Sequence, residues 1–516
     1  MIRSHSQNQL TLPEFDWPFQ VALDQKNRWV TLSKLIPWDA LSEAYYQKLS
    51  LTQGRPAKDA RLVIGAVIIK HKLCLSDEET VFQIQENPYL QYFVGLPGYQ
   101  MKAPFAPSLL VEVRKRMGQS VFDRFYEAII EQLDQIQPKK TPHTSLDDDD
   151  PDNQNPPTAE EGNKPAHQGK LILDGTVVEQ AIRYPTDLSL LNEGRELTEK
   201  LIDILHANTT LKKKPRTYRE KARSAYLAIA KQRRPSSKVI HKGIRQQCQY
   251  LHRNLGHIET LLTHWPEGTS LPVPNWLLHR YWVIQHLYQQ QWGMYQTKTK
   301  RCDHRIVSIS QPQVRPIVRG KQNKPVEFGA KLSVSLTNAG LAHVDKLRWN
   351  AFNEGKDLKS QVEAYKERTG HYPESLLADP LYGTRDNREY LKQKGIHFAG
   401  KPLGRPKKVT DQNRADLKQE KKQRREDYRQ RIPIEGKFGQ GKNAYRLGYI
   451  RAKRADTSAA WINSLFLVMN LMVLLKIFFA PGKQVILNTL LGIWRYGQTL
   501  SKYLVDNPAR LSLMPV

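Results

Sequence analysis

The sequence predicts a mixed α/β domain that carries a helical insertion and follows a separate helical domain. Helix-type apolar periodicity with capping residues runs through residues 30–137. Strand-like apolar runs begin at residue 170, stop, and resume after residue 300, with a helical pattern between. With 516 residues, 39% of them hydrophobic, the chain can form two to four domains with substantial cores.

Residues 30–137 are expected to form several short helices joined by tight turns. The run "KDARLVIGAVIIKHKL" has an apolar face, and Ser76 with Glu79 forms a capping box before "DEETVFQIQEN". Pro88 starts a new segment, and Ser120 with Asp123 is expected to open the helix "VFDRFYEAIIEQL". This pattern fits a helix-turn-helix DNA-binding domain and fits a plain helical bundle equally well.

Residues 138–166 are predicted to be a disordered acidic and proline-rich linker. They contain six prolines, a run of four aspartates at 147–150 and almost no apolar residues. A carboxylate run of this kind is typical of a solvated charge block, so we do not place it in an active site.

The mixed sheet is predicted from apolar runs that alternate with helical segments. Strands are expected at "KLILDGTVV", "RIVSIS", "EFGAKLSVSLT", "GLAHVDKLRW", "ESLLAD" and "IHFAG", and helices at "DLKSQVEAYKERTG" and "TRDNREYLKQKG". The helical insertion covers about 187–300, and its residues 212–245 hold thirteen Lys or Arg against one Glu. Its Trp276, Trp282 and Trp292 are expected to pack within a helix pair, with base stacking as the alternative.

The charge balance predicts a polyanionic partner. Lys and Arg number 79 against 51 Asp and Glu, a net charge of +28, which favours nucleic acid over an anionic membrane. The three cysteines indicate a reducing compartment, and Cys248 and Cys302 with nearby histidines match no standard zinc motif. No secretory signal opens the chain, and the apolar run at 461–480 is expected to be a buried helix and not a membrane span.

Two carboxylates follow apolar strand-like runs. Asp174 ends "LILD", and Asp379 ends "SLLAD" before Pro380, which stops the strand. Carboxylates at the carboxyl ends of strands in an α/β sheet face the crevice where ligands bind, although a lone aspartate there is often a cap.

A third carboxylate, Glu435, stands in the stretch "EGKFGQGKN". If residues 432–450 form a helix with Pro433 in its first turn, then Arg431, Glu435, Phe438 and Lys442 lie on one face at about 100° per residue. The same stretch nearly matches a phosphate-binding loop, but it lacks a preceding apolar strand and a Ser or Thr after the lysine.

Converging carboxylates need a cation between them. Two Mg²⁺ ions about 4 Å apart would neutralise the three groups and promote an in-line phosphoryl displacement, and Mn²⁺ can substitute because it also favours oxygen ligands. The alternative is that Glu435 only pairs with Arg431 or Lys442 on a surface helix.

These residues resemble the Y-R-E-K signature of insertion-sequence DDE transposases, in the retroviral-integrase superfamily. That pattern is Tyr, two residues, Arg, three residues, Glu, six residues, Lys, and the chain has Tyr428, Arg431, Glu435 and Lys442 at this spacing. The segments around Asp174 and Asp379 resemble those around the family's first two catalytic aspartates, although Pro380 and Leu381 depart from the expected residues.

The resemblance implies an RNase H-like catalytic domain at 167–480 and a helical amino-terminal DNA-binding domain at 1–137, with 481–516 as a tail. Asp174, Asp379 and Glu435 would be the catalytic residues and would ligate two Mg²⁺ ions, while Tyr428, Arg431 and Lys442 would contact the DNA. The implied activity is cleavage of DNA at terminal inverted repeats and joining of the ends to target DNA, in a complex that contains at least a dimer.

The resemblance also implies a cytoplasmic, nucleoid-associated protein of a bacterium or archaeon, with no membrane partner. Two alternatives stay open: a non-enzymatic DNA-binding protein derived from a transposase, and an RNase H-like nuclease without strand transfer. The presence of all three carboxylates and both cations argues against the first alternative.

Overall fold

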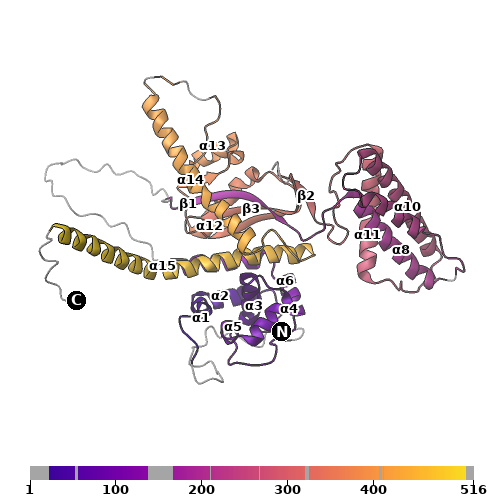
Figure 1. Cartoon of the computed structure of the whole chain (residues 1–516), viewed down its shortest axis with the longest axis horizontal. Coiled ribbons are helices and arrows are strands. Elements are labelled where there is room, and N and C mark those ends of the chain that lie inside the picture. Colours follow the sequence, from indigo (N-terminus) through magenta and orange to yellow (C-terminus); the bar gives the residue numbers. More distant parts are fainter. Residues whose placement is uncertain are drawn as a thin grey trace. The chain divides into compact units, whose positions relative to one another are not determined.

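The computed structural model divides the chain into two compact units (Figure 1). One unit comprises residues 1–166, 337–343 and 463–516, and the other comprises residues 167–336 and 344–462. The structure describes residues 22–50, 52, 56–136, 167–209, 211–266, 268–319, 325–405, 409–410 and 412–506. The predicted linker at 138–166 lies outside these residues.

Seven helices form the amino-terminal part of the first unit. They are α1 (Arg28–Leu35), α2 (Trp38–Tyr46), α3 (Ala60–Lys72), α4 (Asp77–Glu86), α5 (Pro88–Phe93), α6 (Ser108–Arg116) and α7 (Gln119–Ile136). The Ser76 side chain accepts a hydrogen bond from the Glu79 backbone N–H, and Pro88 is the first residue of α5, so both predicted helix starts are confirmed. The predicted cap at Ser120 is wrong, because α7 begins one residue earlier and the Gln119 side chain bonds Asp123 across its first turn.

The apolar run at 461–480 is part of one long helix, α15 (Ala455–Asp506), whose residues from 463 onward cluster with the first unit. Within the described residues, Ala455–Ala480 is the helix long and apolar enough to cross a membrane, and 61% of its most apolar window is buried in the protein. Its two asparagines have partners: Asn470 exchanges two hydrogen bonds with the Ala342 backbone, and Asn463 donates to Gln119. The expected burial is therefore confirmed for most of this stretch, up to Leu474, whereas Phe478 and Phe479 near its end are exposed. The predicted catalytic domain extended to residue 480, whereas the residues from 463 onward cluster with the amino-terminal helices. Helix α15 also continues to Asp506, through much of the predicted tail at 481–516.

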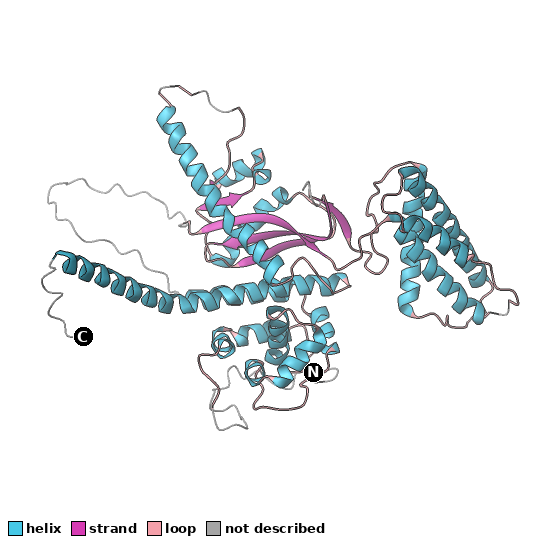
Figure 2. Cartoon of the chain, viewed as in Figure 1, coloured by secondary structure: helices cyan, strands magenta, loops and turns pink. Residues whose placement is uncertain are grey.

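The second unit contains the predicted mixed sheet (Figure 2). Its strands are β1 (Lys170–Glu179), β2 (Arg315–Val318), β3 (Val326–Thr337), β4 (Ala342–Arg348), β5 (Ser375–Ala378) and β6 (His397–Phe398). The order is β2-β3-β1-β5-β6, with β4 also paired to β3. The β1, β5 and β6 strands are parallel neighbours, whereas β2 and β3 are antiparallel.

Helices cover the parallel part of the sheet. Leu171 and Leu173 of β1 pack into a buried cluster with residues of β5, α12 (Leu358–Thr369) and α13 (Arg385–Gln393). Successive strand residues point to opposite faces, so Lys170, Ile172 and Asp174 face the other side. There they meet α14 (Arg414–Ala444), where the Lys170 ammonium donates to Gln430 at 2.8 Å.

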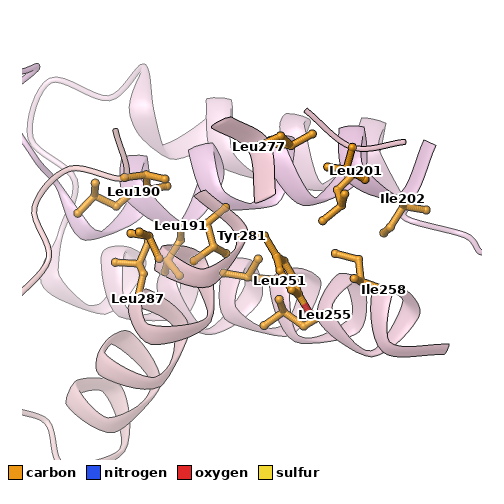
Figure 3. Packing of buried hydrophobic residues seen from close by; sticks show 14 of the residues in the cluster. Leu190, Leu191, Leu201, Ile202, Leu251, Leu255, Ile258, Leu277, Tyr281 and Leu287 are labelled. Carbon is orange, nitrogen blue, oxygen red and sulfur yellow. The ribbon is translucent and has the colours of Figure 1, made fainter. Parts of the chain in front are cut away.

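The insertion between β1 and β2 is helical, as predicted. It consists of α8 (Asp187–Ala207), α9 (Arg219–Ala230), α10 (Ser237–Thr263) and α11 (Asn275–Gln296). Figure 3 shows its core, in which Leu191, Leu251, Ile258 and Leu287 are fully buried. The predicted strand "RIVSIS" is wrong: Ile306 and Ile309 are buried in this helical core and the segment forms no strand.

Two of the three tryptophans in α11 are more exposed than predicted. Trp276 and Trp282 are 45% and 57% exposed, whereas Trp292 packs against the insertion core. Packing within a helix pair is therefore confirmed only for Trp292.

The helix that carries the Y-R-E-K residues is longer than predicted and begins earlier. Helix α14 spans 31 residues, with Pro433 in its interior and not in its first turn. Strong helix formers fill the preceding run "LKQEKKQRREDYRQR", and Glu420 with Arg424 adds an ion pair four residues apart. Residues 435–443 lie entirely within this helix, so the phosphate-binding loop is excluded.

Candidate active site

Asp174 lies in the middle of β1 and not at its end as predicted, because β1 continues past β5 to pair with β3. The register nevertheless brings it to the carboxyl end of β5: Leu173 is opposite Ala378, the last residue of that strand. The Asp174 side chain is 17% exposed, and its Oδ1 accepts a hydrogen bond from the Gly175 backbone N–H at 2.7 Å.

Asp379 directly follows β5, as predicted, and it is exposed. Pro380 ends the strand and starts a short 3-10 turn, Pro380–Tyr382, in which the Tyr382 N–H donates to the Asp379 carbonyl. The parallel pairing of β1 and β5 therefore places both aspartates at the same edge of the shorter strand.

Arg431 connects Asp174 to Glu435. Its Nη1 donates to Asp174 Oδ2 at 3.3 Å, and its Nη2 forms an ion pair with Glu435 Oε1 one helical turn away. The Arg431 guanidinium also lies 5.5 Å from the centre of the exposed Tyr428 ring. Buried Ile434 and Phe438 fix this part of α14.

The pKa of the Asp174 carboxyl reflects its burial and the charged groups near it. Burial is the main reason that the pKa of Asp174 is raised above its ordinary value, and the negative charges of Asp379 and Glu435 raise it further. The Gly175 N–H and the Arg431 guanidinium act in the opposite direction. The structure thus brings together residues from β1, β5 and α14, far apart in the sequence.

The donor set suits a hard divalent cation, but the described side chains do not form a ready metal site. Among the residues that the structure describes, no group of three or more His, Cys, Asp and Glu side chains is arranged to hold a metal ion. The Arg431 guanidinium lies between Asp174 and Glu435 and supplies positive charge to both carboxylates. The carboxylates fit Mg²⁺ by their chemistry, because hard divalent cations prefer oxygen ligands.

Lys442 lies in the last turn of α14, about two turns beyond Glu435, and is partly buried. Its contact with DNA, like that of Tyr428 and Arg431, stays a prediction.

Sequence reasoning missed two groups that surround Asp174. Glu354 forms an ion pair with Lys331 of β3, and its carboxylate lies so close to Gly175 that a Cβ there would be 2.8 Å from Oε1. The Tyr382 side chain is fully buried, and the negative charges of Glu354 and Asp174 add to the effect of burial in raising its pKa. Of these two groups, only Tyr382 could have been found from the sequence, because it follows Asp379 by three residues.

A described cavity is separate from this site. A cavity of about 1140 Å³ lies within the helical insertion, and none of the predicted site residues lines it.

Comparison with known proteins gives matches in both halves of the chain. Residues 376–472 match the family described as "Transposase DDE domain", and residues 18–116 match "Transposase domain (DUF772)". An uncharacterized protein, ORF8 in the nfe locus of Rhizobium meliloti, is 32% identical over 164 residues, which are 31% of this chain and 66% of that protein. No solved structure matches the chain.

The two family matches cover different parts of the candidate machinery. The first contains Asp379, Glu435 and the other Y-R-E-K residues, and the second covers most of the amino-terminal helices. Both matched domains are transposase domains, so the two matches together support an insertion-sequence transposase.

Proposed function

We propose that the chain is a metal-dependent DNA transposase that cleaves the ends of an insertion sequence and joins them to target DNA. The observation that carries this proposal is the pairing of Arg431 with both Asp174 and Glu435, beside the end of β5 that Asp379 follows. The mixed sheet with parallel β1, β5 and β6 supports an RNase H-like domain.

Asp174, Asp379 and Glu435 would hold the divalent ions. Two bound Mg²⁺ ions would supply an activated oxygen nucleophile and charge stabilisation for an in-line displacement at phosphorus. The negative charges of Asp379 and Glu435 raise the pKa of Asp174, and a bound cation would relieve this repulsion.

The cationic side chains of α14 would orient the DNA. Arg431 is the residue best placed to exchange its carboxylate partners for a phosphate, because a guanidinium binds both groups through paired N–H donors. Lys442 would contact the backbone two turns away, and Tyr428 would pack beside Arg431. The amino-terminal helices would recognise the terminal inverted repeats, and synapsis of two ends would require at least a dimer.

Incubation of the purified protein with Mg²⁺ and DNA that contains the repeats flanking its reading frame tests this proposal. We expect strand cleavage followed by joining of the 3′ ends to a second DNA. Binding of the repeats without cleavage would favour the non-enzymatic alternative, and cleavage without joining would favour a nuclease.

A further inference from the structure

The outer surface of the helical insertion carries an unbalanced concentration of positive charge. All thirteen Lys and Arg side chains between residues 212 and 245 are exposed, on the segment before α9, on α9, on the connection into α10 and on the first turns of α10. We propose that this surface, here called the basic segment, binds the phosphate backbone of duplex DNA as a second contact region, separate from the carboxylate site. The inference rests on the proposed function in that it takes DNA as the partner.

Acidic side chains of the protein neutralise little of this charge. Lys214 and Arg219 pair with Asp203, at 2.8 and 2.7 Å. Across the described part of the insertion, the other cations of the segment form no ion pair within 4.0 Å, and Glu220 is the segment's one acidic residue. Crowded like charges destabilise a folded surface, so their concentration favours a polyanionic partner that relieves the repulsion.

The concentration is greatest at the connection between α9 and α10. Lys231, Arg233 and Arg234 are exposed within four residues, immediately before the amino-terminal end of α10 at Ser236. The helix dipole adds partial positive charge at that end, so phosphate groups are attracted by the side chains and the helix together.

Helices α12 and α13 of the same unit do not share this charge pattern. On α12 and α13, the cations Lys359, Lys366 and Lys392 alternate with acidic residues, and Glu363 accepts hydrogen bonds from two tyrosines. The excess on the basic segment is therefore a local feature of the insertion and not a consequence of the basic composition alone.

Tyr218 adds a second observation on the same segment. It is 43% exposed and precedes α9 in the left-handed backbone region, with φ of 53°, which is unfavourable for a bulky side chain. The Arg253 guanidinium stacks 4.7 Å from its ring centre. An exposed tyrosine held among cations is a typical donor to DNA phosphates.

Affinity for a labelled duplex of arbitrary sequence, measured in EDTA as a function of salt, tests the proposal. The full chain with Lys231→Gln, Arg233→Gln and Arg234→Gln should bind roughly tenfold or more weakly at about 0.1 M salt, with a salt slope smaller by up to about three. Lys231→Arg, Arg233→Lys and Arg234→Lys together should keep wild-type binding, which shows that charge and not local structure is responsible. The charge-matched control is Lys359→Gln, Lys366→Gln and Lys392→Gln, which should bind as wild type does.

Equal affinity and salt slope for the triple Gln variant and the wild type would overturn the inference, as would an equal loss in the control. A triple Gln variant that no longer binds anionic phospholipid vesicles but binds DNA as the wild type does would also overturn it. Because EDTA prevents metal-dependent cleavage, these results are independent of whether the carboxylates catalyse a reaction. Failure of the proposed function would instead appear as absence of cleavage in Mg²⁺.

Discussion

Arg431 occupies a position that its sequence spacing explains only in part. Its pairing with Glu435, four residues later on one helix, follows from helix periodicity. Its hydrogen bond to Asp174, 257 residues away, depends on how α14 packs across β1 and could not be read from the sequence. The same is true of Glu354, which reaches Gly175 only because a short turn and β3 bring it there.

Replacement of Arg431 should separate its two roles. Arg431→Gln removes the counter-charge between Asp174 and Glu435 and a candidate phosphate ligand, so DNA cleavage in Mg²⁺ should fall by about 10²-fold or more. Arg431→Lys should restore little of it, because an ammonium cannot bind two groups through a planar fork. Single-turnover cleavage rates measure both effects. A rate for Arg431→Gln within twofold of the wild-type rate would show that the guanidinium only pairs with carboxylates.

Asp77, at the start of α4, forms ion pairs with two buried cations of the amino-terminal helices. Its carboxylate pairs with Arg114 at 2.6 Å and with Lys70 at 3.0 Å, and both cations are buried. Burial alone would raise the pKa of Asp77, but the two cations outweigh this effect and hold the pKa below the ordinary value of 3.8. The ionised carboxylate therefore stabilises the fold above pH 3.8, and this contribution is lost as the pH falls through the lower, folded-state pKa.

Asp77→Asn should lower the free energy of unfolding by about 3 kcal/mol at neutral pH, because two buried cations lose their counter-ion. Urea unfolding at a series of pH values measures the difference from wild type. The difference should be constant near neutrality and shrink below pH 3.8. A difference that does not depend on pH would contradict the assigned ion pairs.

At the scale of elements, the predictions succeeded where periodicity and caps agreed. Helices α3, α4, α12 and α13 and the strands β1, β3 and β5 were predicted from such signals. The segment "RIVSIS" has the alternation of a strand, yet it packs its isoleucines into the insertion core. Helix α14 was shortened in the prediction because proline was assumed to mark its start. In the first case packing overrode the local signal, and in the second the helix formers before the proline extended the helix.

The glycines of α14 and β3 should respond to substitution in opposite directions. A Cβ on Gly436 would meet nothing within 4 Å, so Gly436→Ala should stabilise the helix by about 1 kcal/mol. A Cβ on Gly329 would lie 1.8 Å from the Val178 carbonyl oxygen, so Gly329→Ala should destabilise the sheet by about 1–3 kcal/mol. Urea midpoints compare the two variants, and a destabilising Gly436→Ala would show that the helix is locally strained.

At the scale of the whole molecule, the sequence predicted which regions are helical and which form the sheet. It did not predict which segments belong to each of the two compact units. The mixed sheet, its helical insertion and the preceding helices were all expected. The clustering of residues 463–516 and 337–343 with the amino-terminal helices was not, because it depends on contacts such as Asn470 with Ala342, 128 residues apart. The position of Asp379 after β5 and the four-residue spacing of Arg431 and Glu435 could be predicted from the sequence, whereas the position of Arg431 between Asp174 and Glu435 could not.

The central claim is that Asp174, Asp379 and Glu435 act together on DNA. Cleavage of repeat-containing DNA in Mg²⁺ should fall by about 10³-fold or more in each of Asp174→Ala, Asp379→Ala and Glu435→Ala, because each would remove a metal ligand. Glu363→Gln, which removes an exposed carboxylate on α12, should cleave at the wild-type rate. Cleavage by Asp174→Ala or Glu435→Ala at the wild-type rate would contradict the account.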